Sequence, residues 1–113
     1  MAISFGSIGE KYATFLAAAS ADKGEVCKVS ANCTVAGCSA GDEFCGLVRD
    51  LENGHAGVQL GGYMEVACSG TLPSVGYAIL VADGNGGVKT AQTGKTCLVV
   101  FTDSSAGMIG LFL

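Results

Sequence analysis

The residues of this chain that could carry chemistry are one histidine and six cysteines. His55 follows Asn53 and Gly54, a pair typical of turns, so we expect its side chain to face solvent. A nucleophilic Cys–His pair would need a cysteine activated by that imidazole and a third group to orient the ring. No local sequence pattern indicates either group. We therefore predict that the protein is not an enzyme and that it has no catalytic residues.

The cysteines stand at positions 27, 33, 38, 45, 68 and 97 and include no C-x-x-C pair. This spacing lacks the pattern usual for zinc sites and thioredoxin-like centres. Cys27, Cys45 and Cys97 lie where a strand would take a small apolar residue, and free cysteine packs as one. We favour reduced thiols, no metal site and a stability that does not depend on bridges. A disulfide framework is the alternative for so short a chain.

Two further polar segments have chemical patterns of low specificity. Asp42 and Glu43 are adjacent, which is more typical of a loop surface than of paired general acids. The run Gly84–Gly87 is rich in glycine, but it joins two predicted strands and opens no helix, so it lacks the helix end at which phosphate binds. We predict a hairpin turn there, and we expect no cofactor.

Composition excludes several classes of protein. The 113 residues are 50% hydrophobic and 14% charged, with a net charge of −4 and basic residues scattered singly. One domain is expected at this length, and nucleic-acid binding is disfavoured because no basic stripe is present. The longest apolar runs, 77–82 and 97–101, are far shorter than the ~20 residues of a membrane span. The few charges suggest that other protein covers part of the surface.

The chain reads as short apolar segments separated by glycine-rich turns, which predicts an all-β fold. We expect a small single-domain β-barrel or sandwich of short antiparallel strands. The expected strands are 12–16, 25–30, 33–35, 44–48, 57–60, 63–68, 77–82, 88–90, 96–102 and 108–113.

The segment 7–19 also fits a helix. Ser7 and Glu10 have capping-box spacing, and the apolar residues from Ile8 to Ala19 fall on one helical face. The apolar stretch 12–19 also has the look of a signal sequence, but the residues before it carry no net positive charge, so we do not predict secretion. We favour a strand over Tyr12–Leu16, where aromatic and β-branched residues alternate.

Gly24–Val29, Thr34–Ala36 and Ala40–Val48 together resemble the glycine and valine rhythm of small capsid decoration proteins of tailed bacteriophages and prophages, also called cement or head-stabilising proteins. The similarity continues in order through 56–62, 73–77, 80–89 and 97–100, and so covers residues 10–113. Cys33 departs from the pattern, since a turn glycine is expected there, and so do the other cysteines.

The resemblance implies a virion structural protein without catalysis, made in the bacterial host cytoplasm and bound to the outside of the assembled head. Its implied partners are the major capsid protein and two further copies of itself in a homotrimer. The alternative is a small cellular β-barrel that serves as a ligand-binding or assembly module.

Two apolar segments are the expected contact surfaces. Residues 1–9, ahead of a single β domain over 10–113, carry no charged side chain and predict a capsid-binding arm, although a frayed terminus remains the alternative. The arm would use Ile3, Phe5 and Ile8. The run 108–113 would form a costly exposed patch on a monomer, which predicts oligomer contacts. Those contacts would use Met108, Ile109, Leu111 and Phe112.

Overall fold

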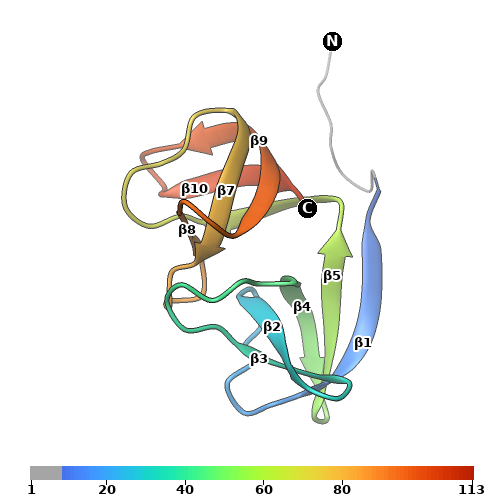
Figure 1. The fold of residues 1–113 in the computed structure, drawn as a ribbon. Coiled ribbons are helices and arrows are strands. Elements are labelled where there is room, and N and C mark those ends of the chain that lie inside the picture. The colour runs from blue at the N-terminus through green and yellow to red at the C-terminus, as the bar shows by residue number, and fades with distance from the viewer. Residues whose placement is uncertain (1–8) are drawn as a thin grey trace.

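The computed structural model describes residues 9–113, and within that range every regular element is a β-strand (Figure 1). The strands are β1 (Lys11–Ala17), β2 (Val26–Ala31), β3 (Thr34–Gly37), β4 (Gly46–Glu52), β5 (His55–Gly61), β6 (Tyr63–Ala67), β7 (Gly76–Ala82), β8 (Val88–Thr90), β9 (Lys95–Asp103) and β10 (Met108–Phe112). The all-β prediction is confirmed. No helix in 9–113 is long and apolar enough to cross a membrane.

The first five strands form a closed barrel in the order β1-β3-β2-β4-β5. Strand β1 closes it, because β1 pairs antiparallel with β5 and parallel with the start of β3, where Leu16 lies opposite Thr34. The parallel pair is the exception to the antiparallel pattern predicted for all strands. Closure leaves the barrel without a free sheet edge, which removes a common site of edge-to-edge aggregation.

The last five strands form a second sheet in the order β6-β10-β9-β7-β8, in which each of the four strand pairs is antiparallel. Its two edges come together at one point, where Cys68, just after β6, bridges Val88 of β8. The Ser69 N–H donates to the Val88 carbonyl oxygen at 2.9 Å. Figure 1 shows this curled sheet, yellow to red, above the blue and green barrel.

Strand β1 decides between the two interpretations of the N-terminal segment. Its residues pair with β5 from Lys11 opposite Gly61 to Leu16 opposite His55, so the helical alternative is wrong for 11–17. The apolar residues here have helical spacing, but the backbone hydrogen bonds that close the barrel stabilise the strand instead. Phe44 and Cys45, predicted as strand, precede β4, although Phe44 is still buried.

Two hairpins contain residues with positive φ that are not glycine. Asn53 (φ 51°) and Gly54 (φ 76°) form the predicted turn between β4 and β5, and two positive φ angles match the twist of a two-residue hairpin. Cys33 (φ 56°) turns the chain between β2 and β3, at the position where the resemblance predicts glycine. A side chain in this region is unfavourable, so this turn is less relaxed than a glycine turn would be.

The interior divides into two clusters of buried apolar side chains. The larger lies mainly within the second sheet and also takes Val26, Phe44 and Leu47 from the barrel half of the chain. The smaller lies inside the barrel and consists of Cys27, Val35, Val48, Ala56 and Val58. The two halves are therefore joined by side-chain packing as well as by the chain.

A buried glutamine holds the connection between the two sheets. Gln59 is fully buried, and its Nε2 donates to the carbonyl oxygens of Gly61 (2.9 Å) and Tyr63 (2.8 Å). Its Oε1 accepts from Arg49 Nε at 2.8 Å. These bonds span the point where β5 ends and β6 begins, so the side chain fixes how the chain leaves the barrel.

Candidate functional site

The only histidine lines an open depression beside the β4–β5 turn. The depression has a volume of about 280 Å³ and is lined by Thr14, Asp50, Glu52, Asn53, His55 and Gly57. His55 is exposed, as predicted, and its Nδ1 lies 3.0 Å from the Asn53 carbonyl oxygen. No cysteine or serine is among these lining residues, and Thr14 carries the one hydroxyl in the list.

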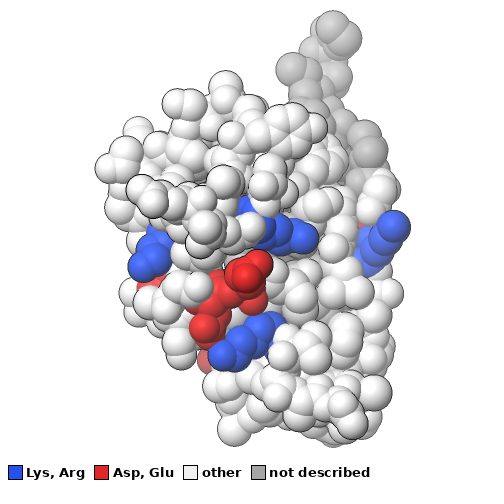
Figure 2. All heavy atoms as spheres, viewed as in Figure 1, with Lys and Arg blue, Asp and Glu red and all other residues white. Residues whose placement is uncertain are grey.

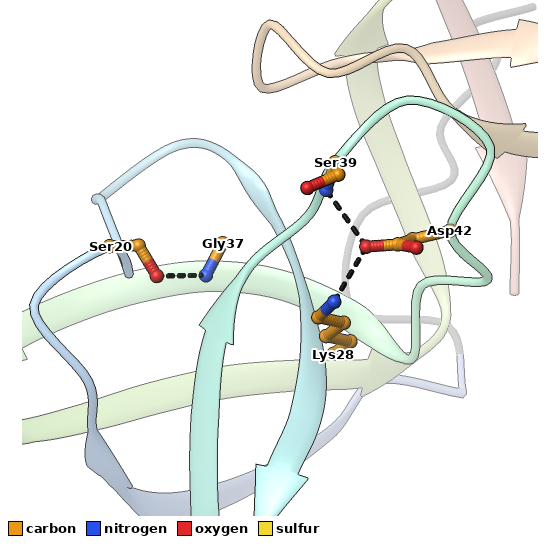
Figure 3. A network of polar contacts seen from close by, with 5 residues as sticks. All are labelled: Ser20, Lys28, Gly37, Ser39 and Asp42. Atoms are coloured by element: carbon orange, nitrogen blue, oxygen red, sulfur yellow. Dashed lines mark hydrogen bonds and ion pairs between the residues drawn. The ribbon is translucent and has the colours of Figure 1, made fainter.

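Asp42 belongs to a polar clasp rather than to an acid pair (Figure 3). Its Oδ2 accepts from Lys28 Nζ at 2.6 Å and from the Ser39 N–H at 2.8 Å. The Lys28 hydrogen bond and then the Ser39 N–H lower the pKa of Asp42, and the same carboxylate raises the pKa of Lys28. Nearby, the Gly37 N–H donates to Ser20 Oγ at 3.1 Å. The clasp ties the 38–45 loop to β2 and keeps Asp42 ionised, which is unsuited to a general acid.

The glycine-rich turn 83–87 binds its own carboxylate. Asp83 Oδ1 accepts from the N–H groups of Asn85 (2.6 Å) and Gly87 (3.1 Å), and Ser69 Oγ donates to Asp83 Oδ2. Burial raises the pKa of Asp83, but these hydrogen bonds outweigh it, so the pKa lies below its usual value. Two N–H donors that a bound phosphate would need are already used, and the predicted hairpin turn is confirmed.

The most extended feature of the surface is a row of large side chains across the second sheet. Phe112 on β10 lies opposite Tyr63 on β6 and Leu98 on β9, and Leu98 lies opposite Tyr77 on β7. We call these four residues the outer row. They point away from the core, because the residues that alternate with them, such as Met64, Leu111 and Val99, are buried.

Exposure increases along the outer row toward β7. The rings of Tyr63 and Phe112 contact edge to face, with centroids 5.6 Å apart, and both are half-buried. Tyr77, at the other end, is 79% exposed, and Val75 and Ile79 beside it are also exposed. On the face drawn in Figure 2, the described charged side chains gather across the middle, and the upper part of the second sheet is uncharged.

Gly110 leaves room for the Phe101 ring and the Tyr63 hydroxyl. A Cβ at this position would collide with the Phe101 ring and with the Tyr63 hydroxyl oxygen. That hydroxyl donates to Glu65 Oε2 at 2.9 Å, and burial followed by Glu65 raises the pKa of Tyr63 to about 12. The tyrosine is therefore neutral at physiological pH, and the charge at this end of the outer row is that of Glu65.

The predicted oligomer contacts divide into two pairs. Met108 and Phe112 are half-buried and point outward, whereas Ile109 and Leu111 are fully buried in the chain's own core. The expectation of an exposed 108–113 patch is therefore wrong for Ile109 and Leu111. The reason is that β10 lies inside the sheet between β6 and β9, so alternate residues of the apolar run face inward. The predicted capsid contacts Ile3, Phe5 and Ile8 lie outside the described residues.

Sequence reasoning did not find the outer row. Its members come from four strands and are separated by up to about fifty positions, so no local pattern joins them. One sequence signal pointed to part of it. In the apolar run that begins at Tyr77, the large residues Tyr77 and Ile79 alternate with a small one, so their side chains share one face of the strand.

All six cysteines are free thiols. Cys27, Cys68 and Cys97 are buried, Cys38 and Cys45 are half-buried, and Cys33 is exposed at its turn. Within residues 9–113, no group of three or more histidine, cysteine, aspartate or glutamate side chains is arranged to hold a metal ion.

No protein-family model matches this chain, and no curated protein is significantly similar to it. The function proposed below is therefore argued from the surface of the protein, and above all from the outer row.

Proposed function

We propose that this protein is a capsid decoration protein of a tailed bacteriophage or prophage, which self-associates through the outer row and stabilises the assembled head from outside. The observation that carries the proposal is the largely uncharged outer row, which crosses four strands and runs from half-buried Tyr63, Phe112 and Leu98 to exposed Tyr77. The order of glycine and valine segments along residues 10–113 supports the same assignment. Such a protein is made in the host cytoplasm and resides on the virion surface.

The charge distribution favours a second copy of this chain as the occupant of the outer row. Each copy carries a net charge of −4, so a contact between copies must avoid bringing its carboxylates together. Tyr77, Leu98 and Ile79 carry no charge, and Glu65 beside the row is hydrogen-bonded to Tyr63. Three copies related by a three-fold axis would bury this surface in a closed ring.

On the capsid, each trimer would make several weak contacts at once. A trimer that touches the major capsid protein at three equivalent points binds with avidity, so no single contact has to be tight. The arm over residues 1–9, with Ile3, Phe5 and Ile8, is the segment we assign to the capsid. A ligand-binding barrel is less well supported, because the depression at His55 is open and its volume is only at the lower limit of the ~300–1,000 Å³ usual for ligand pockets.

The outer row is tested by a double variant, Tyr77→Ser with Leu98→Ser. We expect light scattering to give a trimer mass for the wild-type chain at micromolar concentration and a monomer mass for the variant. The matched control is Leu16→Ser, which removes an exposed apolar side chain from the barrel and should leave the trimer intact. A monomeric wild type that also adds only isolated copies to heads would contradict self-association.

Head binding is tested by co-sedimentation with expanded heads that lack decoration. We expect the full chain to sediment with heads and to add density at three-fold points in an image reconstruction. Deletion of residues 2–9 should abolish sedimentation while the circular dichroism spectrum stays that of a β protein. Undiminished binding by the truncated chain would remove the arm from the proposal, and failure of the full chain to bind would overturn the function.

A further inference from the structure

Three cysteines meet at one end of the barrel. Cys27 on β2 lies opposite Gly37 on β3 and opposite Gly46 on β4. Cys38 and Cys45 are the chain neighbours of those two glycines, so they flank Cys27 from both sides. The closer approach is on the β4 side, where the Cys45 N–H donates to the Cys27 carbonyl oxygen at 2.8 Å.

The Cys27 and Cys45 side chains also contact each other. Cys45 packs against the barrel cluster that contains Cys27, and Cys27 Sγ lies 3.7 Å from the carbonyl oxygen of Gly46, the chain neighbour of Cys45. Cys27 is fully buried, whereas Cys45 is half-buried and is therefore the more accessible of the two.

The two thiols differ in acidity, and Cys45 is the more acidic. The Cys27 hydrogen bond, opposed by burial and aided by Lys95, lowers the pKa of Cys45 to about 7. The same contact and burial raise the pKa of Cys27. Burial and then Asp42 raise the pKa of Cys38 to about 11, so Cys45 is the better nucleophile of the three at neutral pH.

We propose that Cys45 and Cys27 are a redox-active pair that forms an intramolecular disulfide by exchange with a low-molecular-weight disulfide such as oxidised glutathione. In the first step the Cys45 thiolate attacks one sulfur of the small disulfide, whose S–S bond breaks, and one small thiol leaves with a proton from solvent. In the second step Cys27 loses its proton and attacks the Cys45 sulfur, and the second small thiol leaves with that proton. The protein is oxidised by two electrons and one small disulfide is reduced to two thiols.

The bridge would join β2 to the residue that precedes β4 and close the loop that holds the Lys28–Asp42 clasp (Figure 3). The protein would remain reduced in a reducing cytoplasm and become cross-linked after release into an oxidising medium. This inference does not depend on the proposed function, because it concerns only contacts within one chain.

The test uses the full chain, purified reduced and incubated with oxidised glutathione at pH 7.5. After denaturation and alkylation, mass spectrometry should find two thiols fewer than the six of the reduced protein, and a peptide map should link Cys27 to Cys45. The melting temperature of the oxidised form should rise by roughly 10 °C, because the bridge closes a loop of under twenty residues.

Cys33→Ser is the matched control, since Cys33 is exposed at the opposite end of β2 and should not affect the bridge. Cys45→Ser and Cys27→Ala should each abolish it. A bridge mapped to any other pair, a glutathione adduct on Cys33 alone, or two protected thiols in Cys45→Ser would each overturn the proposal. The wild-type peptide map decides the question even if a variant fails to fold.

Discussion

The barrel and the second sheet reach a stable interior by different means. The barrel interior is filled by Cys27, Val35, Val48, Ala56 and Val58, all of them small, and a closed ring of backbone hydrogen bonds surrounds it. The second sheet is curled around large side chains, among them Met64, Leu80, Ile109 and Leu111. A closed barrel of five strands has little internal space, so it depends on its hydrogen-bonded wall, whereas the second sheet depends on burial of apolar area.

The two halves also differ at the surface. The barrel carries the clasp at Asp42 and the polar depression at His55, and its exposed apolar residues Tyr12, Leu16, Val29 and Leu51 come from three strands. The second sheet presents the outer row in a single cross-strand register. Large residues therefore lie on both faces of the second sheet, and those of the inner face are the ones fully buried in the core.

The largest expected effect is in the interior of the second sheet. Leu111→Ala removes a fully buried side chain and should lower the free energy of unfolding by about 3–4 kcal/mol, whereas Val58→Ala in the barrel should cost about 2 kcal/mol. Urea denaturation followed by circular dichroism measures both. Val29→Ala, at a residue 56% exposed, is the control and should change stability by less than ~0.5 kcal/mol. An equal loss for the two buried sites would contradict the contrast between the interiors.

The connection between the halves should respond next most strongly. Gln59→Leu removes both donors to the Gly61 and Tyr63 carbonyl oxygens and the acceptor of Arg49, which should cost about 2–3 kcal/mol. Gln92→Leu makes the same chemical change at an exposed position and serves as the control. If the two variants unfold at the same urea concentration, Gln59 does not hold the connection.

A smaller, pH-dependent effect is expected at the turn of the second sheet. The folded pKa of Asp83 lies below its unfolded value, so the ionised carboxylate stabilises the fold above the unfolded pKa and loses that contribution as the pH falls through the folded pKa. Asp83→Asn should cost about 1–2 kcal/mol at pH 7 and progressively less below pH 4. Thermal melts from pH 7 to pH 2, with Asp22→Asn as control, measure the difference. A cost that does not change with pH would mean that hydrogen-bond geometry, not charge, is what Asp83 supplies.

The smallest effect on stability should come from the outer row. Tyr77 is 79% exposed, so Tyr77→Ser should change the free energy of unfolding of the monomer by less than about 0.5 kcal/mol while weakening self-association. Denaturation at submicromolar protein concentration measures the free energy of unfolding of the monomer without a contribution from self-association. A loss of several kcal/mol there would show that Tyr77 supports the fold rather than an interface.

Most of the strand boundaries followed from local patterns. Asn53 and Gly54, the glycines at 84–87 and the alternation in Tyr63–Ala67 each predict their turn or strand, because positive φ and period-two burial depend only on neighbours along the chain. The exposure of His55 followed in the same way.

The tertiary structure alone decided what those strands build. The residues 11–17 satisfy a helical spacing nearly as well as a strand, and only pairing with β5 makes them β1. The apolar run 108–112 looks like one patch along the chain, but its place between two neighbours sends Ile109 and Leu111 inward and Phe112 outward into a row with Tyr63, Leu98 and Tyr77. Cross-strand register depends on which distant strands pair, and no window of sequence contains that information.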